Sequence, residues 1–195
     1  MPILSSRLLL AAYSRGIFPM AINDRGDIGW FSPDPRAIIP LDDRFHVPHG
    51  LRRTLKAAKF AITINQDFEG VIRACAVSHG STWISKEIIR SYCRLQREGH
   101  AHSVEARLEG ELAGGLYGVQ LGGAFFGESM FHRVTDASKV ALVALVERLR
   151  AGGFLLLDTQ WLTPHLARFG ACEVPRSEYL RRLEIALARD CRFRA

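Results

Sequence analysis

Two polar residues end a stretch that otherwise has the pattern of a buried strand. Three leucines at positions 155–157 run directly into Asp158, and Gln160 follows two residues later. Polar side chains at such a place are costly unless they are paired. Strand side chains alternate, so both residues are expected on one face, with the Asp158 carboxylate accepting from the Gln160 amide. The free amide oxygen could then bind an amine. The alternative is that the pair caps the following helix.

A second group surrounds Glu128 in the stretch GGAFFGESMFHR, residues 122–133. A carboxylate among so many aromatic and apolar residues must be partnered, or its pKa rises. Alternation predicts that Glu128, Met130 and Phe126 share one face of a strand. The functional interpretation is a second site carboxylate. The alternative is a strand glutamate that pairs with an arginine at the sheet edge.

A third group is basic. Helical spacing places Arg52, Lys56 and Lys59 on one face of a helix expected over residues 49–58, with Arg53 beside them and Arg36 upstream. Cations gathered on one face are the arrangement that phosphates require. A solvated helix face is the alternative. The formal net charge of +6 is compatible with an RNA partner, but many other enzymes share such a charge.

Several other chemistries are disfavoured by the residues present. The histidines at 100, 102 and 165 have no Glu or Cys at ligand spacing, so no metal site is expected. Ser129 in GESMF does not meet the G-x-S-x-G pattern of a serine hydrolase. The four cysteines form no C-x-x-C pair, and no apolar run approaches the ~20 residues of a membrane span. We therefore expect a cytoplasmic protein that does not enter the membrane.

The elements that must position these residues follow from periodicity and turn signals. A helix is expected over residues 4–15, then a hairpin at NDRGDIGW, and SPDPR is predicted to be a rigid connector. Helices are further predicted after Asp67 and after Ser85, and from 139 to 153 with Asp136 or Ser138 as the cap. Strands are predicted at 60–65, 102–108, 111–119, 123–131, 154–160 and 172–174, with helices near 164–169 and from Ser177.

From residue 49 onward the predicted order is α-β-α-α-β-β-β-α-β-α-β-α, which indicates an α/β fold with a mixed sheet flanked by helices. An antiparallel meander followed by a βαβ crossover is the pattern of acetyltransferase-like (GNAT-like) folds. The Gly-rich phosphate loop of acetyl-CoA enzymes is missing before the helix that follows GESMF. We place a domain boundary near Asp34, which divides the chain into a small N-terminal domain (1–34) and a catalytic domain (35–195).

These stretches belong to a longer pattern that covers almost the whole chain. In order, they are AYSRGIFPM, WFSPDPRAIIP, FHV…LRRTLK, TWIS, GHAHSVEAR, LAGGLYGV, FFGESMF, ASKVALVALV and LLLDTQ…HLARFGACEVPR. Together they closely resemble the bacterial leucyl/phenylalanyl-tRNA–protein transferases. The combination of GESMF, ASK and D-x-Q is far more specific than any isolated motif.

The resemblance implies a reaction. Enzymes of this family move Leu, Phe or Met from aminoacyl-tRNA to an N-terminal Arg or Lys of a protein, which marks it for the N-degron route. The ester is already activated, so no cofactor is expected. By resemblance, Gln160 holds the acceptor amine, Asp158 orients Gln160, and Glu128 helps to hold the aminoacyl or peptidyl amine. An amide oxygen is a poor base in water, so a relay through the ribose hydroxyl or a water is an alternative to proton transfer to Gln160.

The resemblance also implies an apolar aminoacyl pocket. One methylene is worth only ~1–3 kcal/mol in such a pocket, which agrees with a family that tolerates Leu, Phe and Met. The family is often aromatic at positions 145 and 149; the leucines here predict a roomier pocket and relatively better use of Phe. The pocket residues implied by the resemblance are Leu116, Phe125, Met130, Leu142, Leu145, Leu149 and Leu157.

Two departures from the family pattern affect tRNA binding. The family usually has tryptophan directly after GIFP for the terminal adenosine, whereas this chain has Met20, which stacks less well on a base. Trp83 in TWIS is therefore expected to take that role. The leading segment is short, which predicts a trimmed small domain and weaker tRNA binding. The helix with Arg52, Arg53, Lys56 and Lys59 matches the family's basic patch.

Two other functions are compatible with parts of this sequence. One is a small-molecule N-acyltransferase that uses acyl-CoA, against which the missing phosphate loop argues. The other is a non-catalytic RNA-binding relative in which Met20 marks decay of the site. The presence of Asp158, Gln160 and Glu128 argues against it. The expected partners are aminoacyl-tRNA and proteins with N-terminal Arg or Lys, and we expect a monomer.

Overall fold

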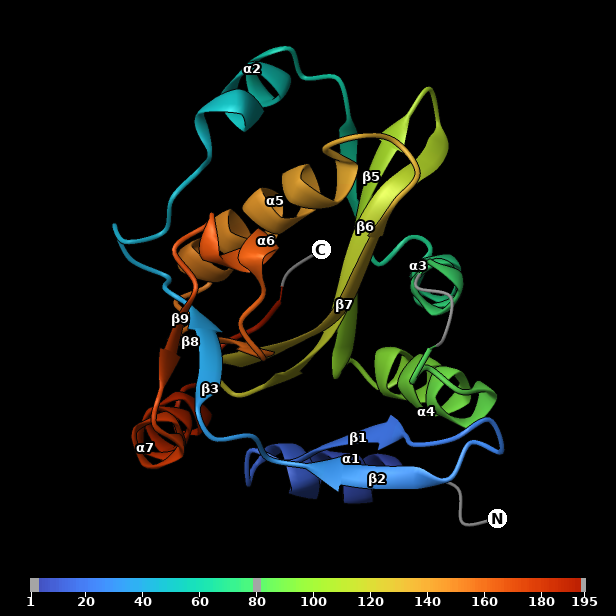
Figure 1. Cartoon of the computed structure of the whole chain (residues 1–195), viewed down its shortest axis with the longest axis vertical. Helices are drawn as coiled ribbons and strands as arrows, with labels where there is room; N and C mark the ends of the chain where they lie inside the picture. The colour runs from blue at the N-terminus through green and yellow to red at the C-terminus, as the bar shows by residue number, and fades with distance from the viewer. Residues whose placement is uncertain (1–3, 79–81, 194–195) are drawn as a thin grey trace.

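The computed structural model describes residues 4–78 and 82–193, which form a mixed sheet covered by helices on both faces (Figure 1). The main sheet has the strand order β4-β5-β6-β7-β8-β3-β9, and β1 and β2 form a separate two-stranded sheet. The strands are β1 Phe18–Ala21, β2 Ile28–Phe31, β3 Arg36–Ile39, β4 Ala61–Ile64, β5 Ala101–Leu108, β6 Glu111–Leu121, β7 Ala124–His132, β8 Leu156–Gln160 and β9 Cys172–Val174. The helices are α1 Ser6–Tyr13, α2 His49–Lys56, α3 Phe68–Val77, α4 Lys86–Arg97, α5 Ala137–Ala151, α6 Pro164–Ala167 and α7 Arg176–Leu187.

The order of elements predicted from residue 49 onward is confirmed. Strand β3 was missed. The sequence pattern predicts only a rigid connector at SPDPR, because its two prolines obscure the short apolar run that follows. Yet all of β3 is buried, and it lies between β8 and β9 in the main sheet. The strand therefore places Arg36, its first residue, next to the end of β8.

The centre of the main sheet is split. Strands β4 to β7 form an antiparallel meander, and the α5 crossover then places β8 parallel to β7. The β7–β8 pairing covers only Ala124, Phe125 and Phe126 against Leu156, Leu157 and Asp158. Beyond these residues the two strands separate, which exposes backbone and side chains that a continuous sheet would cover. The meander and crossover confirm the predicted acetyltransferase-like arrangement.

Helix α5 covers one face of the sheet and α3 and α4 cover the other (Figure 1). Nine residues of α5 are buried, and the helix contacts β5, β6 and β7 on one side and α2 on another. The prediction that its wide apolar face is buried on more than one side is therefore confirmed. Asp136 is the N-cap residue, as one of the two predicted choices, but its side chain makes no capping hydrogen bond.

The first part of the chain packs against the main domain. The predicted hairpin is present as β1 and β2, and α1 contacts α4. Leu9, Tyr13 and Phe18 belong to the same hydrophobic cluster as residues of α3 and α4. This packing fixes the N-terminal segment beside the sheet. The domain boundary near Asp34 stays a prediction.

Within the described residues, no helix is long and apolar enough to cross a bilayer. No group of three or more His, Cys, Asp or Glu side chains in residues 4–78 and 82–193 is arranged to hold a metal ion.

Candidate active site

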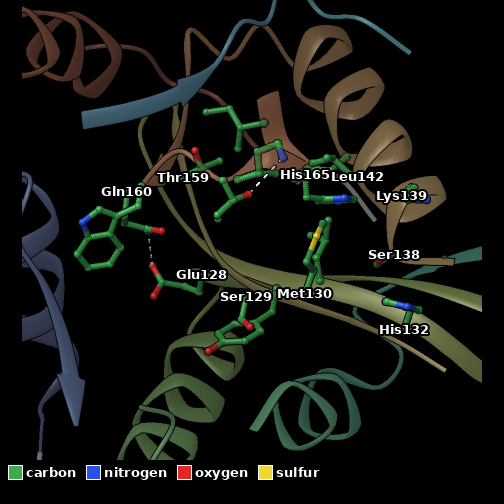
Figure 2. Close-up of a pocket in the computed structure, with 18 of the residues that line it drawn as sticks. Glu128, Ser129, Met130, His132, Ser138, Lys139, Leu142, Thr159, Gln160 and His165 are labelled. Atoms are coloured by element: carbon green, nitrogen blue, oxygen red, sulfur yellow. Dashed lines mark hydrogen bonds between the residues drawn. The ribbon is translucent and has the colours of Figure 1, made fainter. Parts of the chain in front are cut away.

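A cavity of about 560 Å³ opens where β7 and β8 separate (Figure 2). Its walls come from β6, β7, α5 and β8, and the N-terminal hairpin contributes Phe18 and Met20. Most of the lining surface is apolar, and Glu128 and Gln160 are among the polar residues that contribute to it. The split in the sheet therefore creates an apolar chamber with a carboxylate and an amide beside it.

Asp158 is completely buried and accepts four hydrogen bonds. Arg36 donates twice, from Nε to Oδ1 at 2.8 Å and from Nη2 to Oδ2 at 2.6 Å. The Tyr179 hydroxyl donates to Oδ2 at 2.9 Å, and the backbone N–H of Gln160 donates to Oδ1 at 2.9 Å. The expected bond from the Gln160 side-chain amide to Asp158 is not present. The Asp158 carboxylate therefore contacts the backbone N–H of Gln160 and not its side chain.

Arg36 is a buried site-supporting residue and not part of an exposed basic group. Its side chain is 1% exposed, and it also donates to the Gly16 carbonyl at 2.9 Å. Its guanidinium lies over the rings of Phe18 and Tyr179, 4.9 and 4.5 Å from their centroids. Burial is the largest influence and acts to lower the pKa of Arg36, but its hydrogen bonds to Asp158 and the negative charge of that carboxylate together outweigh burial and raise the pKa. The predicted grouping of Arg36 with the phosphate-binding cations is wrong.

Gln160 ends β8 in a left-handed backbone conformation, with φ +60°. This conformation costs energy for a non-glycine residue, and the bond from its N–H to Asp158 helps to hold it. The side-chain amide donates to Oε1 of Glu128 at 3.4 Å (Figure 2). The capping alternative is wrong, because the Thr163 hydroxyl caps α6 by accepting from Leu166.

Glu128 occupies a β-bulge. Tyr117 pairs with Ser129 and Gly118 with Gly127, so Glu128 has no residue opposite it. The bulge reverses the expected alternation: Met130 packs with the core cluster on the α5 face, whereas Phe126 belongs to the cluster on the other face. The predicted common face for Phe126, Glu128 and Met130 is therefore wrong.

The Glu128 side chain is half-buried at the cavity wall, and its carboxylate is partnered by a tyrosine hydroxyl. The Tyr13 hydroxyl donates to it at 2.7 Å and accepts from the Tyr92 hydroxyl, which itself lies 3.4 Å from the carboxylate. The alternative interpretation, in which Glu128 pairs with an arginine at the sheet edge, is wrong, because Glu128 accepts hydrogen bonds from Tyr13 and Gln160. Burial raises the pKa of Glu128 to about 8, although the Tyr13 hydrogen bond opposes this rise. Near neutral pH the group therefore titrates.

The cavity lining includes most of the residues predicted for the aminoacyl pocket. Leu116 and Met130 enter from the meander, Leu142 and Leu145 from α5, and Leu157 from β8. Phe125 and Leu149 do not line the cavity; both are fully buried in the adjoining core cluster. Phe125 stacks against Phe193 at a centroid distance of 5.3 Å. Phe125 and Leu149 therefore pack behind the residues that line the cavity.

Met20 and Trp83 both line the cavity on the side of the N-terminal hairpin. Phe18 and Trp161 add aromatic surface there, with ring centroids 5.2 Å apart. A base entering from this side would find several flat surfaces on which to stack.

The basic residues lie outside the cavity on α2 and the turn after it. Arg52, Arg53, Lys56 and Lys59 are all exposed. The helix ends at Lys56, earlier than predicted, and Ala58 has a positive φ of 46°. Lys59 therefore does not continue the helical face, and its ammonium lies 5.4 Å from the ring centroid of Phe60.

Four residues of the site were not found by sequence reasoning: Arg36, Tyr13, Tyr92 and Tyr179. Tyr13 and Tyr92 come from helices expected to be amphipathic, and nothing in a helical pattern separates a core tyrosine from a site tyrosine. A signal was available for Arg36, because a buried Asp158 requires a cationic or donor partner.

The split mixed sheet, the apolar cavity within it and the carboxylate and amide at its edge define an acyltransferase of the acetyltransferase-like fold. Comparison with known families gives a more specific assignment. The family model described as "Leucyl/phenylalanyl-tRNA protein transferase" matches residues 38–184, and the model of that family's N-terminal domain matches residues 3–34. The chain belongs to the leucyl/phenylalanyl-tRNA–protein transferase family.

Similar curated proteins agree with this membership. The leucyl/phenylalanyl-tRNA–protein transferase of Herpetosiphon aurantiacus is 56% identical over 97% of this chain and 98% of its own length. That of Gloeobacter violaceus is also 56% identical, over 98% of each chain. Among solved structures, L-PGS from Bacillus licheniformis is 15% identical over 77% of this chain and 51% of its own, with a TM-score of 0.45.

Proposed function

We propose that this protein moves Leu, Phe or Met from aminoacyl-tRNA to the N-terminal Arg or Lys of acceptor proteins and thereby marks them for N-degron degradation. The observation that carries the proposal is the position of the Glu128–Gln160 pair beside an apolar cavity of about 560 Å³. Such a cavity suits an apolar aminoacyl side chain. Family membership supports the choice of substrates.

The reaction exchanges an ester for an amide. The acceptor α-amine attacks the aminoacyl carbonyl carbon, the bond from that carbon to the ribose oxygen breaks, and one proton passes from the amine nitrogen to the leaving ribose hydroxyl. The ester is already activated, so the reaction needs no ATP and no metal. The main task of the protein is to bring a neutral amine to the carbonyl in the right orientation.

Gln160 places the amine in this proposal. Its amide NH2 donates to Glu128, so its amide oxygen can accept an N–H of the acceptor amine. Asp158 fixes the Gln160 backbone, and Arg36 and Tyr179 fix Asp158. Asp158 is thus a positioning residue that acts through the main chain.

Glu128 handles the proton of the amine. An α-amino group has a pKa of about 7.7–8.0 in model peptides, and the pKa of Glu128 is raised to about 8. The two groups are therefore nearly matched, so a proton can pass between them at little cost. The ionised carboxylate binds the incoming ammonium and accepts its extra proton, which leaves a neutral nucleophile. As the amide forms, the nitrogen loses a second proton to the ribose oxygen, directly or through a water, and keeps one as the amide N–H.

The apolar walls and the aromatic side of the cavity bind different parts of the aminoacyl-tRNA. Leu116, Met130, Leu142, Leu145 and Leu157 hold the aminoacyl side chain. Trp83, with Met20, takes the terminal adenosine. The exposed cations of α2 contact tRNA phosphates outside the cavity. The protein works as a monomer in this proposal.

A transfer assay tests the proposal. Purified protein is incubated with Phe-tRNA carrying labelled Phe and with a peptide that begins with Arg. We expect label in the peptide, and none when its α-amine is acetylated. A parallel reaction replaces Phe-tRNA with acyl-CoA. Transfer from acyl-CoA and not from Phe-tRNA would contradict the proposal and favour the small-molecule acyltransferase.

A further inference from the structure

A second polar group lies at another part of the cavity wall, away from Glu128 and Gln160. It comprises His132 at the end of β7, Ser138 and Lys139 in the first turn of α5, and His165 on α6 (Figure 2). None of these side chains takes part in the transfer chemistry described above. All four line the same cavity that takes the aminoacyl group in the proposed function.

The first turn of α5 lacks a side-chain cap. Asp136 is the N-cap residue, but its carboxylate contacts Lys139 Nζ at 2.7 Å and the Thr54 hydroxyl at 3.1 Å. Ala137 N–H bonds to the Val134 carbonyl, and no side chain among the described residues accepts from the next two N–H groups. Asp136, Ser138 and Lys139 line the cavity at this end of the 15-residue helix. The positive end of the helix dipole therefore faces the cavity, and no side chain among the described residues caps it.

Two side chains beside this helix end carry polar atoms that have no hydrogen-bond partner among the described residues. Ser138 is only 5% exposed, and its hydroxyl makes no hydrogen bond within the part of the chain that the structure describes. His165 Nε2 is buried and equally unpartnered among the described residues. Both residues line the cavity. Buried donors without partners are costly, so these two groups are suited to a ligand that accepts hydrogen bonds.

The charges around the group favour an anion. Burial, together with the positive charges of Lys139 and Arg168 nearby, lowers the pKa of His165, so the ring is neutral and can donate one N–H. Among the described residues, Asp136 is the one carboxylate on this wall of the cavity, and it is bound by Lys139 and Thr54. Helix amides, a serine hydroxyl, an imidazole and a lysine together are the donors that recognise phosphate oxygens.

We propose that Ser138, His165 and the first turn of α5 bind a backbone phosphodiester of the tRNA 3′ end. This inference rests on the proposed function, because it assumes that aminoacyl-tRNA enters this cavity. The link to RNA comes from α2, which packs on α5 and reaches the site through the Thr54–Asp136 hydrogen bond. The same helix carries the exposed Arg52, Arg53 and Lys56. Cations for the outer backbone and donors for the 3′ end thus lie on adjoining helices.

The test compares two non-hydrolysable donors that differ in phosphates. One is 3′-deoxy-3′-phenylalanylamido-adenosine, which has none; the other is the same group on a CCA trinucleotide. Binding of each is measured for the wild type, Ser138→Ala and Ser138→Asp. Aspartate is favoured in the first turn of a helix, so the fold tolerates the change while its carboxylate repels phosphate. Ser177→Asp is the control, because Ser177 holds the same second position of α7 and is exposed.

We expect Ser138→Asp to weaken binding of the trinucleotide by roughly tenfold or more and Ser138→Ala by a few-fold. Binding of the adenosine compound should change less than twofold, and Ser177→Asp should change neither. Inorganic phosphate, at constant ionic strength, should compete with the trinucleotide and not with the adenosine compound. Equal weakening of both ligands by Ser138→Asp, or no effect on the trinucleotide, would overturn the proposal. Absence of Phe transfer by the wild type would instead count against the proposed function.

Discussion

At the scale of single residues, the site depends on a short chain of contacts from Arg36 to Glu128. Arg36 holds Asp158, Asp158 holds the backbone of Gln160, and the Gln160 amide contacts Glu128. Arg36, Asp158 and Gln160 are buried, Glu128 is half-buried at the cavity, and the Arg36–Asp158 ion pair is fully desolvated. Removing one partner leaves the other as an uncompensated buried charge, which is far more costly than losing the pair itself.

Arg36→Met should therefore destabilise the protein by about 3–5 kcal/mol and also slow transfer, because Gln160 loses its support. Urea unfolding and the transfer assay measure the two effects. Arg44→Met is the matched control: Arg44 contacts Asp42 at the same 2.6 Å, but both side chains are exposed. We expect little change in its unfolding midpoint. If both variants unfolded alike, the buried pair would not have the role assigned to it.

Sequence reasoning identified Asp158, Gln160 and Glu128 as site candidates but gave some of their contacts wrongly. Alternation in a strand correctly indicated that the Asp158–Gln160 pair needed an explanation. It could not reveal that Gln160 adopts a left-handed conformation or that Glu128 lies in a bulge, because both depend on pairing with other strands. Arg36 was misplaced for the same reason: its partner is 122 residues away along the chain.

At the scale of elements, the split between β7 and β8 and the buried helix α5 determine the shape of the cavity. Successive turns of α5 present Leu142 and Leu145 to the cavity, whereas Leu149 faces the core. Periodicity alone predicts that all three are buried, but it does not tell a cavity wall from a packed core. This distinction separates residues that select the substrate from residues that stabilise the fold.

Two substitutions on α5 test this distinction. Leu145→Phe should fill part of the cavity and shift the ratio of kcat/KM for Phe over Leu toward Leu by about tenfold. Leu149→Phe should overpack the core, cost about 1–3 kcal/mol of stability and leave the ratio unchanged. Competition between Leu-tRNA and Phe-tRNA, with thermal unfolding of each variant, gives both readouts. A specificity shift from Leu149→Phe alone would reverse the assignment.

Helix α2 carries a prediction about tRNA. Arg52→Glu with Lys56→Glu should weaken tRNA binding and reduce the slope of log affinity against log salt by about 1–2, because each lost phosphate contact removes ~0.7–0.9. Arg90→Glu with Arg97→Glu, on exposed positions of α4, changes the net charge equally and is the control. Binding is measured between low and moderate salt. Equal losses in both double variants would mean that only net charge matters.

At the scale of the whole molecule, the N-terminal segment completes the site rather than merely preceding it. Tyr13 from α1 donates to Glu128, Gly16 accepts from Arg36, and Phe18 and Met20 line the cavity. The pKa of Glu128 therefore depends on Tyr13, which lies 115 positions away along the chain. Burial raises the pKa of Glu128 above its value in the unfolded chain, so the folded state favours the protonated carboxyl group. The stability that this protonated group contributes is fully present below about pH 4.5 and is lost as pH rises through about 8.

Tyr13→Phe tests this dependence. The Tyr13 hydrogen bond lowers the pKa of Glu128, so its removal should raise that pKa further. Transfer by the wild type should increase as pH rises through about 8, and the same limb should move to higher pH in Tyr13→Phe. The pH profile of kcat/KM, taken between pH 6 and 10, gives the midpoint. A limb that stays in place or moves to lower pH would contradict this role of Tyr13.

The most direct test of the central claim is the single-turnover rate of Phe transfer from bound Phe-tRNA to a peptide that begins with Arg. Gln160→Ala and Glu128→Gln should each bind Phe-tRNA nearly as well as the wild type but transfer Phe roughly 10²-fold or more slowly. Glu128→Gln should also lose the rise through about pH 8 that depends on this carboxyl group. Wild-type rates in both variants would show that the carboxylate and amide at the split sheet do not perform the transfer.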